Sequence, residues 1–226
     1  MKTLAILPVK SFADAKQRLA ESLGAGSRRA LAQAMFADVL GSLRRVPGLD
    51  GIAVVTSDRS AEAAARADRL IVLADTAQAG QSEAALIGIR HALADGYDRV
   101  LLIPGDTPLI QPADLAGLMV AGDGVTIVPD RHGTGTNALV LAPPDAIEPS
   151  FGLDSFARHV AAADAAGVPH RVEKVAALAL DVDTPADLAE LVAELEHRRG
   201  QAPSTRGALR QRDRAGASPV GARASD

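Results

Sequence analysis

Short, fully apolar runs recur along the chain, and stretches with the periodicity of an amphipathic helix separate most of them. The runs cover residues 4–9, 52–55, 70–73, 100–103 and 125–128, and two further ones cover 138–141 and 177–180. Helical spacing is found at 82–94, 114–120, 154–166, 185–196 and in a long segment from 31 to 46 that Ser27 can cap. Strands buried on both faces and joined by helices are typical of a mostly parallel sheet. We therefore predict an α/β domain whose sheet is flanked by helices.

The composition excludes several classes of function. The chain has no cysteine, so disulfides, thiolate nucleophiles and Cys-based metal sites are ruled out. Its net charge is −4 and only 2% of its residues are aromatic, so we expect no nucleic acid partner. No apolar run approaches the ~20 residues of a membrane span, and the run at 4–9 is too short for a signal peptide. The default expectation is a cytoplasmic protein; its oligomeric state stays open, and a homodimer is compatible with the sequence.

Residues 198–226 differ from the rest of the chain. They contain seven arginines and two aspartates, with only Leu209 and Val220 as large apolar side chains. Such a segment buries too little apolar surface to offset the entropy cost of ordering. We therefore expect one domain over residues 1–197 and a disordered basic tail over 198–226. Removal of the residues after Gly200 is expected to leave activity unchanged.

In a parallel α/β sheet, ligands bind beyond the carboxyl ends of the strands, so the residues that follow each strand are the candidate site residues. After the first run come three cations that suit a phosphate chain, although an ordinary exposed basic loop would look the same. The loop is not a Walker A motif, because G-x-x-x-x-G-K-[ST] does not occur in the chain. Small polar residues follow the second and third runs, where they either line a pocket or cap a helix. These candidates are Lys10, Lys16 and Arg18, then Ser57 and Asp58, then Gly80, Gln81 and Ser82.

Two acidic segments stand out. The run at 100–103 leads into P-G-D-T-P-L, which places Asp106 on a turn at the tip of a central strand. Near residue 180, L-D-V-D-T-P holds Asp181 and Asp183, which point to the same side if the segment is extended. Mg²⁺ prefers one or two carboxylates together with phosphate oxygens and water, so Asp106 and one of these aspartates would complete a metal site. The alternative is helix capping, by Asp106 in the first segment and by Asp183 or Thr184 in the second.

Two more loops suit an anion. Residues 133–138 match G-x-G-x-x-A, the pattern of a Rossmann oxidoreductase, but a strand and two prolines follow where that fingerprint requires a helix. Residues 150–155 lie at a predicted helix start, where an anion is favoured. Together with the basic loop after the first run, these segments indicate two phosphorylated substrates.

The combination of these segments resembles the CofC/FbiD family over nearly all of residues 1–197. The matching segments are L-P-V-K at 7–10, K-Q-R-L at 16–19, P-G-D-T-P-L at 104–109, G-T-G-T-N-A-L at 133–139, F-G-L-D-S-F at 151–156 and L-D-V-D-T-P at 180–185. The resemblance implies a single domain with a nucleotide-diphospho-sugar-transferase-like fold, similar to the molybdopterin guanylyltransferases. It also implies a guanylyltransferase that condenses GTP with phosphoenolpyruvate, 2-phospholactate or 3-phosphoglycerate and releases pyrophosphate in coenzyme F-420 biosynthesis. Phosphoenolpyruvate is the acid we expect.

The resemblance further implies roles for single residues. Asp106 and Asp183 would hold Mg²⁺, and Lys10, Lys16 and Arg18 would bind the nucleotide phosphates. Ser57, Asp58, Gly80, Gln81 and Ser82 are further candidates for nucleotide binding because of their place after the second and third runs. Asp106, Lys16 and Arg18 would stabilise charge during catalysis, and Thr136, Gly152 and Ser155 would bind the phosphorylated acid. The family would have Gly-Leu-Asn where this chain has Gly-Gln-Ser at 80–82. This segment therefore does not identify guanine as the base of the nucleotide. Two alternatives stay open: a nucleotidyltransferase for molybdopterin or a sugar phosphate, and a guanine-nucleotide-binding regulator without turnover.

Overall fold

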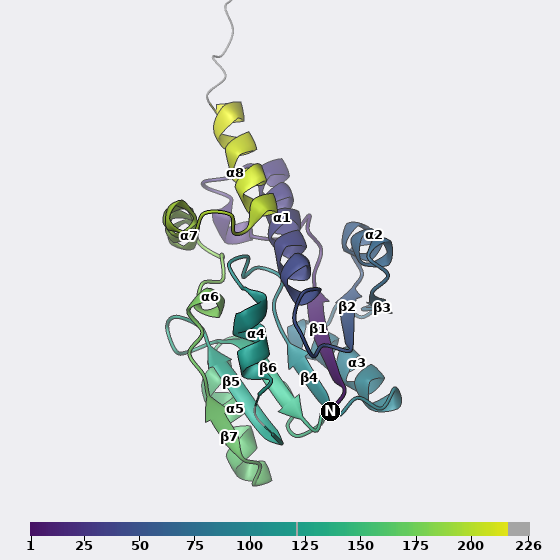
Figure 1. The fold of residues 1–226 in the computed structure, drawn as a ribbon. Helices are drawn as coiled ribbons and strands as arrows, with labels where there is room; N and C mark the ends of the chain where they lie inside the picture. Colours follow the sequence, from purple (N-terminus) through teal and green to yellow (C-terminus); the bar gives the residue numbers. More distant parts are fainter. Residues whose placement is uncertain (121, 217–226) are drawn as a thin grey trace, which may run out of the picture.

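The apolar runs form one twisted sheet, seen in the computed structural model of Figure 1, which describes residues 1–120 and 122–216. Within these residues the sheet has seven strands in the order β3-β2-β1-β4-β6-β5-β7. All neighbours are parallel except β6, which runs antiparallel to both β4 and β5. The prediction of a mostly parallel sheet is therefore confirmed. The strands are β1 (Thr3–Val9), β2 (Gly51–Thr56), β3 (Ile71–Ala74), β4 (Arg99–Leu102), β5 (Gly124–Pro129), β6 (Thr136–Ala142) and β7 (His170–Val172).

The reversed direction of β6 decides what meets at the edge of the sheet. Leu102 at the end of β4 pairs with Leu139, so the residues that begin β6 lie beyond the carboxyl end of β4. Thr136 and Asn137 therefore share this edge with the turn that carries Asp106. Parallel strands bring only their carboxyl ends to this edge, whereas β6 brings its beginning.

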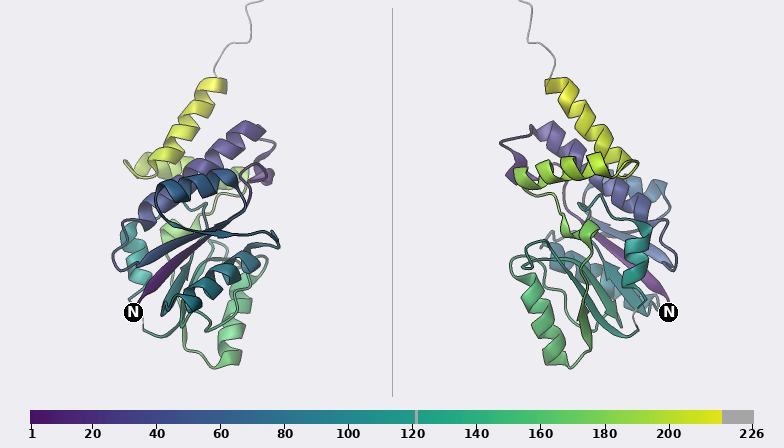
Figure 2. Two further views of the ribbon diagram at one scale, coloured as in Figure 1. Left: turned by 90° about the vertical axis from the view of Figure 1, so that its right-hand side faces the viewer. Right: turned by 60° about the vertical axis from the view of Figure 1, so that its left-hand side comes forward.

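Helices cover both faces of the sheet (Figure 2). Side chains of β1 alternate between the two layers: Leu7 joins the core under α1, and Ile6 joins the core under α3. The first layer contains α1, α2, α4, α6, α7 and α8, and the second contains α3 and α5. The helices are a 3₁₀ turn η1 (Gln17–Leu19), α1 (Ala25–Leu43), α2 (Arg59–Ala67), α3 (Gln81–Ala94), α4 (Pro112–Leu118), α5 (Ser155–Ala166), α6 (Ala176–Ala179), α7 (Pro185–His197) and α8 (Pro203–Gly216).

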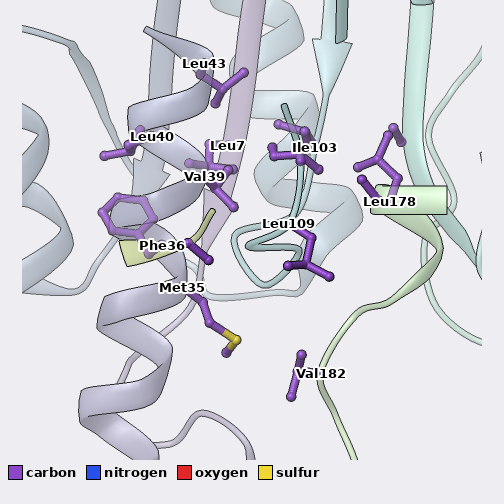
Figure 3. Close-up of a cluster of buried hydrophobic side chains, with 14 of the residues drawn as sticks. Leu7, Met35, Phe36, Val39, Leu40, Leu43, Ile103, Leu109, Leu178 and Val182 are labelled. Carbon is purple, nitrogen blue, oxygen red and sulfur yellow. The ribbon is translucent and has the colours of Figure 1, made fainter. Parts of the chain in front are cut away.

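The core of the first layer also fixes the segments that carry acidic residues. Figure 3 shows Leu109 and Val182 in the same cluster as Met35 of α1. Leu109 follows the Asp106 turn, and Val182 lies between Asp181 and Asp183. Both apolar side chains are at most 1% exposed, so they anchor their neighbouring carboxylates against the body of the protein.

Two local predictions were wrong. Residues 176–179 form the short helix α6 rather than a strand, because a four-residue apolar run satisfies either conformation and β7 at 170–172 takes the place beside β5. The first long helix begins at Ala25 with Gly24 as its N-cap, so Ser27 lies inside the helix. None of the helices in the described ranges is long and apolar enough to cross a membrane.

The prediction of a disordered tail from residue 198 is also wrong, because residues 203–216 form α8 beside α1 (Figure 1). The Asp38 carboxylate on α1 accepts hydrogen bonds from the backbone N–H groups of Ser204 (3.0 Å) and Thr205 (2.8 Å), which caps α8 from a neighbouring helix. Leu209 is buried in the core under α1. One capping carboxylate and a few apolar contacts therefore order a segment with little apolar content, whereas residues 217–226 lie outside the described residues.

Candidate active site

Lys16 lies where the loop after β1 meets the two acidic segments. Its backbone is left-handed (φ 57°) at the start of η1, and its side chain is only 7% exposed. The ammonium donates hydrogen bonds to Asp106 Oδ2 and to Asp183 Oδ1, the latter at 2.8 Å. Burial alone lowers the pKa of Lys16, but the charges of Asp106 and Asp183 and their hydrogen bonds raise it above its ordinary value. Lys16 is thus a charged lysine that draws together two carboxylates far apart in sequence.

The backbone around Asp183 is held by the start of α7. Thr184 is the N-cap of α7, and Asp187 completes a capping box with it. The Asp187 carboxylate also accepts the N–H of Asp183 at 3.0 Å. Capping therefore belongs to Thr184 and Asp187, which leaves the Asp183 side chain facing Lys16.

Asp106 and Asp183, called the acidic pair below, have the carboxylate oxygens that Mg²⁺ prefers as ligands. Asp106 Oδ1 is buried and accepts no hydrogen bond from any described residue, so it is available to a further ligand. Residues 1–120 and 122–216 contain no cluster of three or more His, Asp or Glu that could hold a metal. Two carboxylates, with water and phosphate oxygens in the other positions, are a common way of binding Mg²⁺. Asp106 and Asp183 fit that pattern.

Asp181 takes a different role from Asp183. Its Oδ1 accepts a hydrogen bond from Asn137 Nδ2 at 3.1 Å, and the same amide donates to the Leu178 carbonyl at 2.7 Å. Burial, together with the negative charge of Asp106, raises the pKa of Asp181. Asn137 therefore ties the start of β6 to the acidic segment.

A pocket of about 340 Å³ opens beside Lys16. One part of its wall is charged and the other part is apolar, which suits a ligand with a phosphate chain and a ring. Its lining includes Lys10, Lys16, Asp106 and Asp183 in the charged part and Phe12, Ala32, Met35, Phe36 and Ala84 in the apolar part. Asp75 after β3, and Gly80 and Gln81 at the start of α3, also line the pocket.

Asp75 is a pocket residue that the sequence analysis missed. It follows β3 directly and is 6% exposed, and its Oδ1 accepts the N–H of Gln78 at 2.9 Å. The signal that identified Asp106, an acidic residue just after a strand, was present at this position too.

Several predicted nucleotide-binding residues lie outside the lining of this pocket. Arg18 and Ser57 are exposed and do not line it. Asp58 caps α2 by accepting the N–H groups of Ser60 and Ala61, and its other oxygen accepts the N–H of Phe12 at 2.9 Å. It therefore holds the loop after β1 in place, as the capping alternative required.

Ser82 makes a link between two loops. Its hydroxyl oxygen accepts the N–H of Phe151 at 2.8 Å, which connects the start of α3 to the segment at 150–155. The neighbouring Gly80 and Gln81 line the pocket. Ser82 thus joins the pocket side of the molecule to the predicted acid-binding segment.

Thr136, Gly152 and Ser155 gather around the start of α5. Thr136 Oγ1 lies 2.9 Å from Nδ1 of His159, a histidine with no exposed surface on α5. Gly152 has a φ of +108°, which a residue with a side chain rarely adopts, and its carbonyl accepts the N–H of Ser155 at 3.1 Å. The structure brings these three residues together at the edge shared by β4 and β6.

Comparisons with known proteins place this geometry in a family. A family model described as "Guanylyl transferase CofC like" matches residues 3–206. A phosphoenolpyruvate guanylyltransferase from Conexibacter woesei is 51% identical over 215 residues, covering 93% of this chain and 96% of the relative. A 2-phospho-L-lactate guanylyltransferase from Methanothermobacter thermautotrophicus is 35% identical over 193 residues, covering 85% of each.

Solved structures agree on the fold. A protein from Desulfovibrio desulfuricans classed with the nucleotide-diphospho-sugar transferases matches with a TM-score of 0.74 at 22% identity, covering 95% of this chain and 96% of that one. A nucleotidyl transferase from Methanothermobacter thermautotrophicus matches with a TM-score of 0.61 at 18% identity, covering 88% and 99%. The predicted nucleotide-diphospho-sugar-transferase-like fold is confirmed, and with the family match over residues 3–206 the chain belongs to the CofC-like guanylyl transferases.

Proposed function

We propose that this protein transfers a guanylyl group from GTP to phosphoenolpyruvate and releases pyrophosphate, as a step of coenzyme F-420 biosynthesis. The names of the relatives at 51% and 35% identity support a phosphorylated three-carbon acid as acceptor, and the more similar one names phosphoenolpyruvate. The observation that carries the proposal is the placement of Asp106 and Asp183 on one ammonium in the wall of the pocket.

The reaction brings two anions together. The acceptor is a phosphate monoester, which is largely dianionic near neutral pH because its second pKa is about 6. Its oxygen can therefore attack the α-phosphorus of GTP without a general base, and the bond to the pyrophosphate leaving group breaks. What the site must supply is alignment and positive charge, and this term is often the largest in catalysis.

The residues of the chain divide this work. Lys10 and Lys16, both in the pocket wall, are suited to the triphosphate, and Arg18 would have to approach from outside the pocket. Asp106 and Asp183 would hold Mg²⁺, which when bound neutralises phosphate charge. In the present arrangement the Lys16 ammonium is the cation between the two carboxylates. Lys16 would therefore exchange these carboxylates for phosphate oxygens once nucleotide is bound.

Asp75 is suited to recognise guanine. Guanine presents N1–H and an exocyclic amine as neighbouring donors, and a carboxylate offers only acceptors. Oδ1 of Asp75 already accepts the Gln78 N–H, and its side chain lies in the same pocket as the apolar residues that would contact the ring. Adenine has a donor only at its exocyclic amine, because its N1 is an acceptor, so it could not supply the two neighbouring donors that guanine offers to this carboxylate.

The test uses the full chain with GTP, MgCl₂ and one of three acids: phosphoenolpyruvate, 2-phospholactate or 3-phosphoglycerate. We expect pyrophosphate release that depends on the acid, with a guanylylated acid identified by mass spectrometry. CTP and ATP serve as nucleotide controls, and mannose 1-phosphate tests the sugar-phosphate alternative. Nucleotide binding without pyrophosphate release in every combination would contradict the proposal and favour a non-catalytic regulator.

A further inference from the structure

Thr136 and His159 form a polar contact inside the protein that the proposed chemistry does not use. The His159 ring has no exposed surface and Thr136 is 7% exposed. The ring lies edge-on to Phe151, with centroids 5.3 Å apart. We infer that His159 is a positioning residue that turns the hydroxyl hydrogen of Thr136 toward an anionic group of the phosphorylated acid. The inference rests on the proposed function in one respect, the identity of the anion.

The partners of His159 fix which ring nitrogen carries the proton. The backbone N–H of Ser150 points at Nε2, with the two nitrogens 2.8 Å apart. A backbone N–H can only donate, so Nε2 must be the acceptor and carries no hydrogen. Burial, helped by the charge of Arg158, lowers the pKa of His159 to about 4, so the ring is neutral at pH 7. A neutral ring without hydrogen on Nε2 has it on Nδ1.

This tautomer sets the direction of the second hydrogen bond. Nδ1–H donates to Thr136 Oγ1 across 2.9 Å, so the Thr136 oxygen is an acceptor in this contact. The hydroxyl hydrogen must then point elsewhere, and no acceptor for it is found among the described residues. A nearly buried hydroxyl with a free hydrogen and a fixed oxygen is prepared to donate to a ligand oxygen.

The surroundings of His159 place that donor at the proposed acid subsite. Ser150, whose N–H fixes the tautomer, precedes the segment that contains Gly152 and Ser155. The Arg158 guanidinium holds the same segment by donating to the carbonyl and hydroxyl oxygens of Ser150 at 2.8 and 2.7 Å. Asn137, which follows Thr136, donates a hydrogen bond to Asp181, two residues before Asp183. One histidine thus connects the position of this segment to the orientation of a donor at the start of β6.

The tautomer can be measured on the wild-type protein without turnover. We expect ¹⁵N–¹H correlation spectra of the His159 ring to show a hydrogen on Nδ1 and none on Nε2 at pH 7. A hydrogen on Nε2, or a doubly protonated ring, would overturn the inference whatever the substrate is. His197→Asn, at an exposed position, helps to assign the ring signals.

A double-mutant cycle tests the effect on the acid. Thr136→Val removes the donor at nearly constant volume, and His159→Asn removes the ring. Loss of a hydrogen bond to a charged group corresponds to about 10- to 100-fold weaker binding. We therefore expect each variant to raise KM for phosphoenolpyruvate by about this factor and to leave KM for GTP within about 2-fold. Thr136→Ser, which keeps a hydroxyl, should recover most of the loss.

The cycle separates positioning from a structural role. If His159 acts through the Thr136 hydroxyl, His159→Asn has little further effect on KM for the acid once Thr136 is Val. An equal effect in both backgrounds, or an equal rise in both KM values, would overturn the inference. If wild type releases no pyrophosphate with any acid, the proposed function fails. Calorimetric binding of phosphoenolpyruvate or inorganic phosphate to the same four proteins then decides the inference separately, and absence of binding to wild type overturns it.

Discussion

Lys16 and Asp106 form an ion pair, and each partner also has a group outside it: the ammonium reaches Asp183, and Asp106 has an unused acceptor oxygen. The Lys16 side chain is 7% exposed and its ammonium is shared with Asp183, and the buried Oδ1 of Asp106 accepts no hydrogen bond from the residues that the structure describes. The pair therefore stabilises the protein without nucleotide and still has an acceptor for a further ligand. Both properties can be tested.

Asp106→Asn removes a charge and keeps the shape of the side chain. If Asp106 helps to hold the Mg²⁺ that neutralises phosphate charge during guanylyl transfer, the variant should lower kcat by about 100-fold or more, the scale seen for the loss of one electrostatic contact. The measurement is pyrophosphate release with phosphoenolpyruvate at saturating MgCl₂. Asp145→Asn, at an exposed position, is the matched control. Near-normal activity of Asp106→Asn would reject the metal-binding role.

Lys16→Met should destabilise the metal-free protein, because Asp106 and Asp183 then repel each other without a shared cation. Asp183 is 45% exposed, so we expect a loss of about 1–3 kcal/mol, less than for a fully buried pair. Thermal unfolding in EDTA and in about 10–20 mM MgCl₂ measures this loss of stability. Magnesium should recover part of the loss in Lys16→Met and nothing in Lys16→Met/Asp183→Asn. An unchanged Tm in EDTA would show that the lysine does not hold the carboxylates together.

Asp75→Asn should weaken the preference for guanine. An amide can accept only through its one oxygen, so we expect kcat/KM for GTP to fall by about 10- to 100-fold. Inosine triphosphate lacks the exocyclic amine and provides the comparison. Wild type should prefer GTP over inosine triphosphate, and the variant should reduce that preference. Urea unfolding shows whether the variant loses stability because the Gln78 N–H has lost its acceptor. An unchanged preference for GTP over inosine triphosphate would show that Asp75 does not recognise the base.

His159 predicts a stability that depends on pH. Its pKa is lowered from 6.5 to about 4 on folding, so the unfolded chain binds this proton more readily than the native protein. Its contribution is therefore complete above pH 6.5 and is lost as the pH falls toward 4. The expected loss is about 3 kcal/mol, at 1.36 kcal/mol per pKa unit. Urea unfolding at pH 7 and pH 4.5 measures most of this loss, and His159→Asn should flatten the pH dependence. Equal slopes for the two proteins would contradict the assignment.

Removal of the chain after Gly200 should lower stability, contrary to what a disordered tail implies. It removes the donors to Asp38 and the Leu209 contact with the core under α1. We expect a loss of about 3 kcal/mol or more from the unpaired carboxylate and the exposed apolar surface. Removal of residues 217–226 alone is the matched control, and its Tm is the reference for the longer truncation. Equal Tm values for both truncations would show that α8 does not stabilise the protein.

The sequence predicted the sheet and the acidic pair for the same physical reason. Parallel strands bring their carboxyl ends to one edge, so residues after separate strands can be expected to meet there. Asp181 and Asp183 could be expected on one side of an extended segment, because side chains alternate along it. The pattern alone did not choose between them, and only their contacts with Asn137 and Lys16 distinguish their roles. The packing of Val182 in the core agrees with that alternation.

What could not be predicted depends on contacts with distant backbone. Asp58 and Ser82 were expected at the nucleotide, but their oxygens accept backbone N–H groups from Phe12 and Phe151, loops far away in the sequence. Likewise, α8 is capped by Asp38, which no local pattern connects to Ser204. The sequence pattern of a short polar residue after a strand is the same whether its side chain faces a ligand or a neighbouring loop.

The reversed direction of β6 has a consequence for how this enzyme could change its substrate. In the proposed function, the pocket at the parallel half of the sheet would bind the nucleotide, and the opposing strand would supply Thr136 to the acid from its first residues. Mutations at the start of β6 would then alter the choice of acceptor while the half that binds the donor keeps its register. The choice of donor and the choice of acceptor would depend on different parts of one continuous sheet.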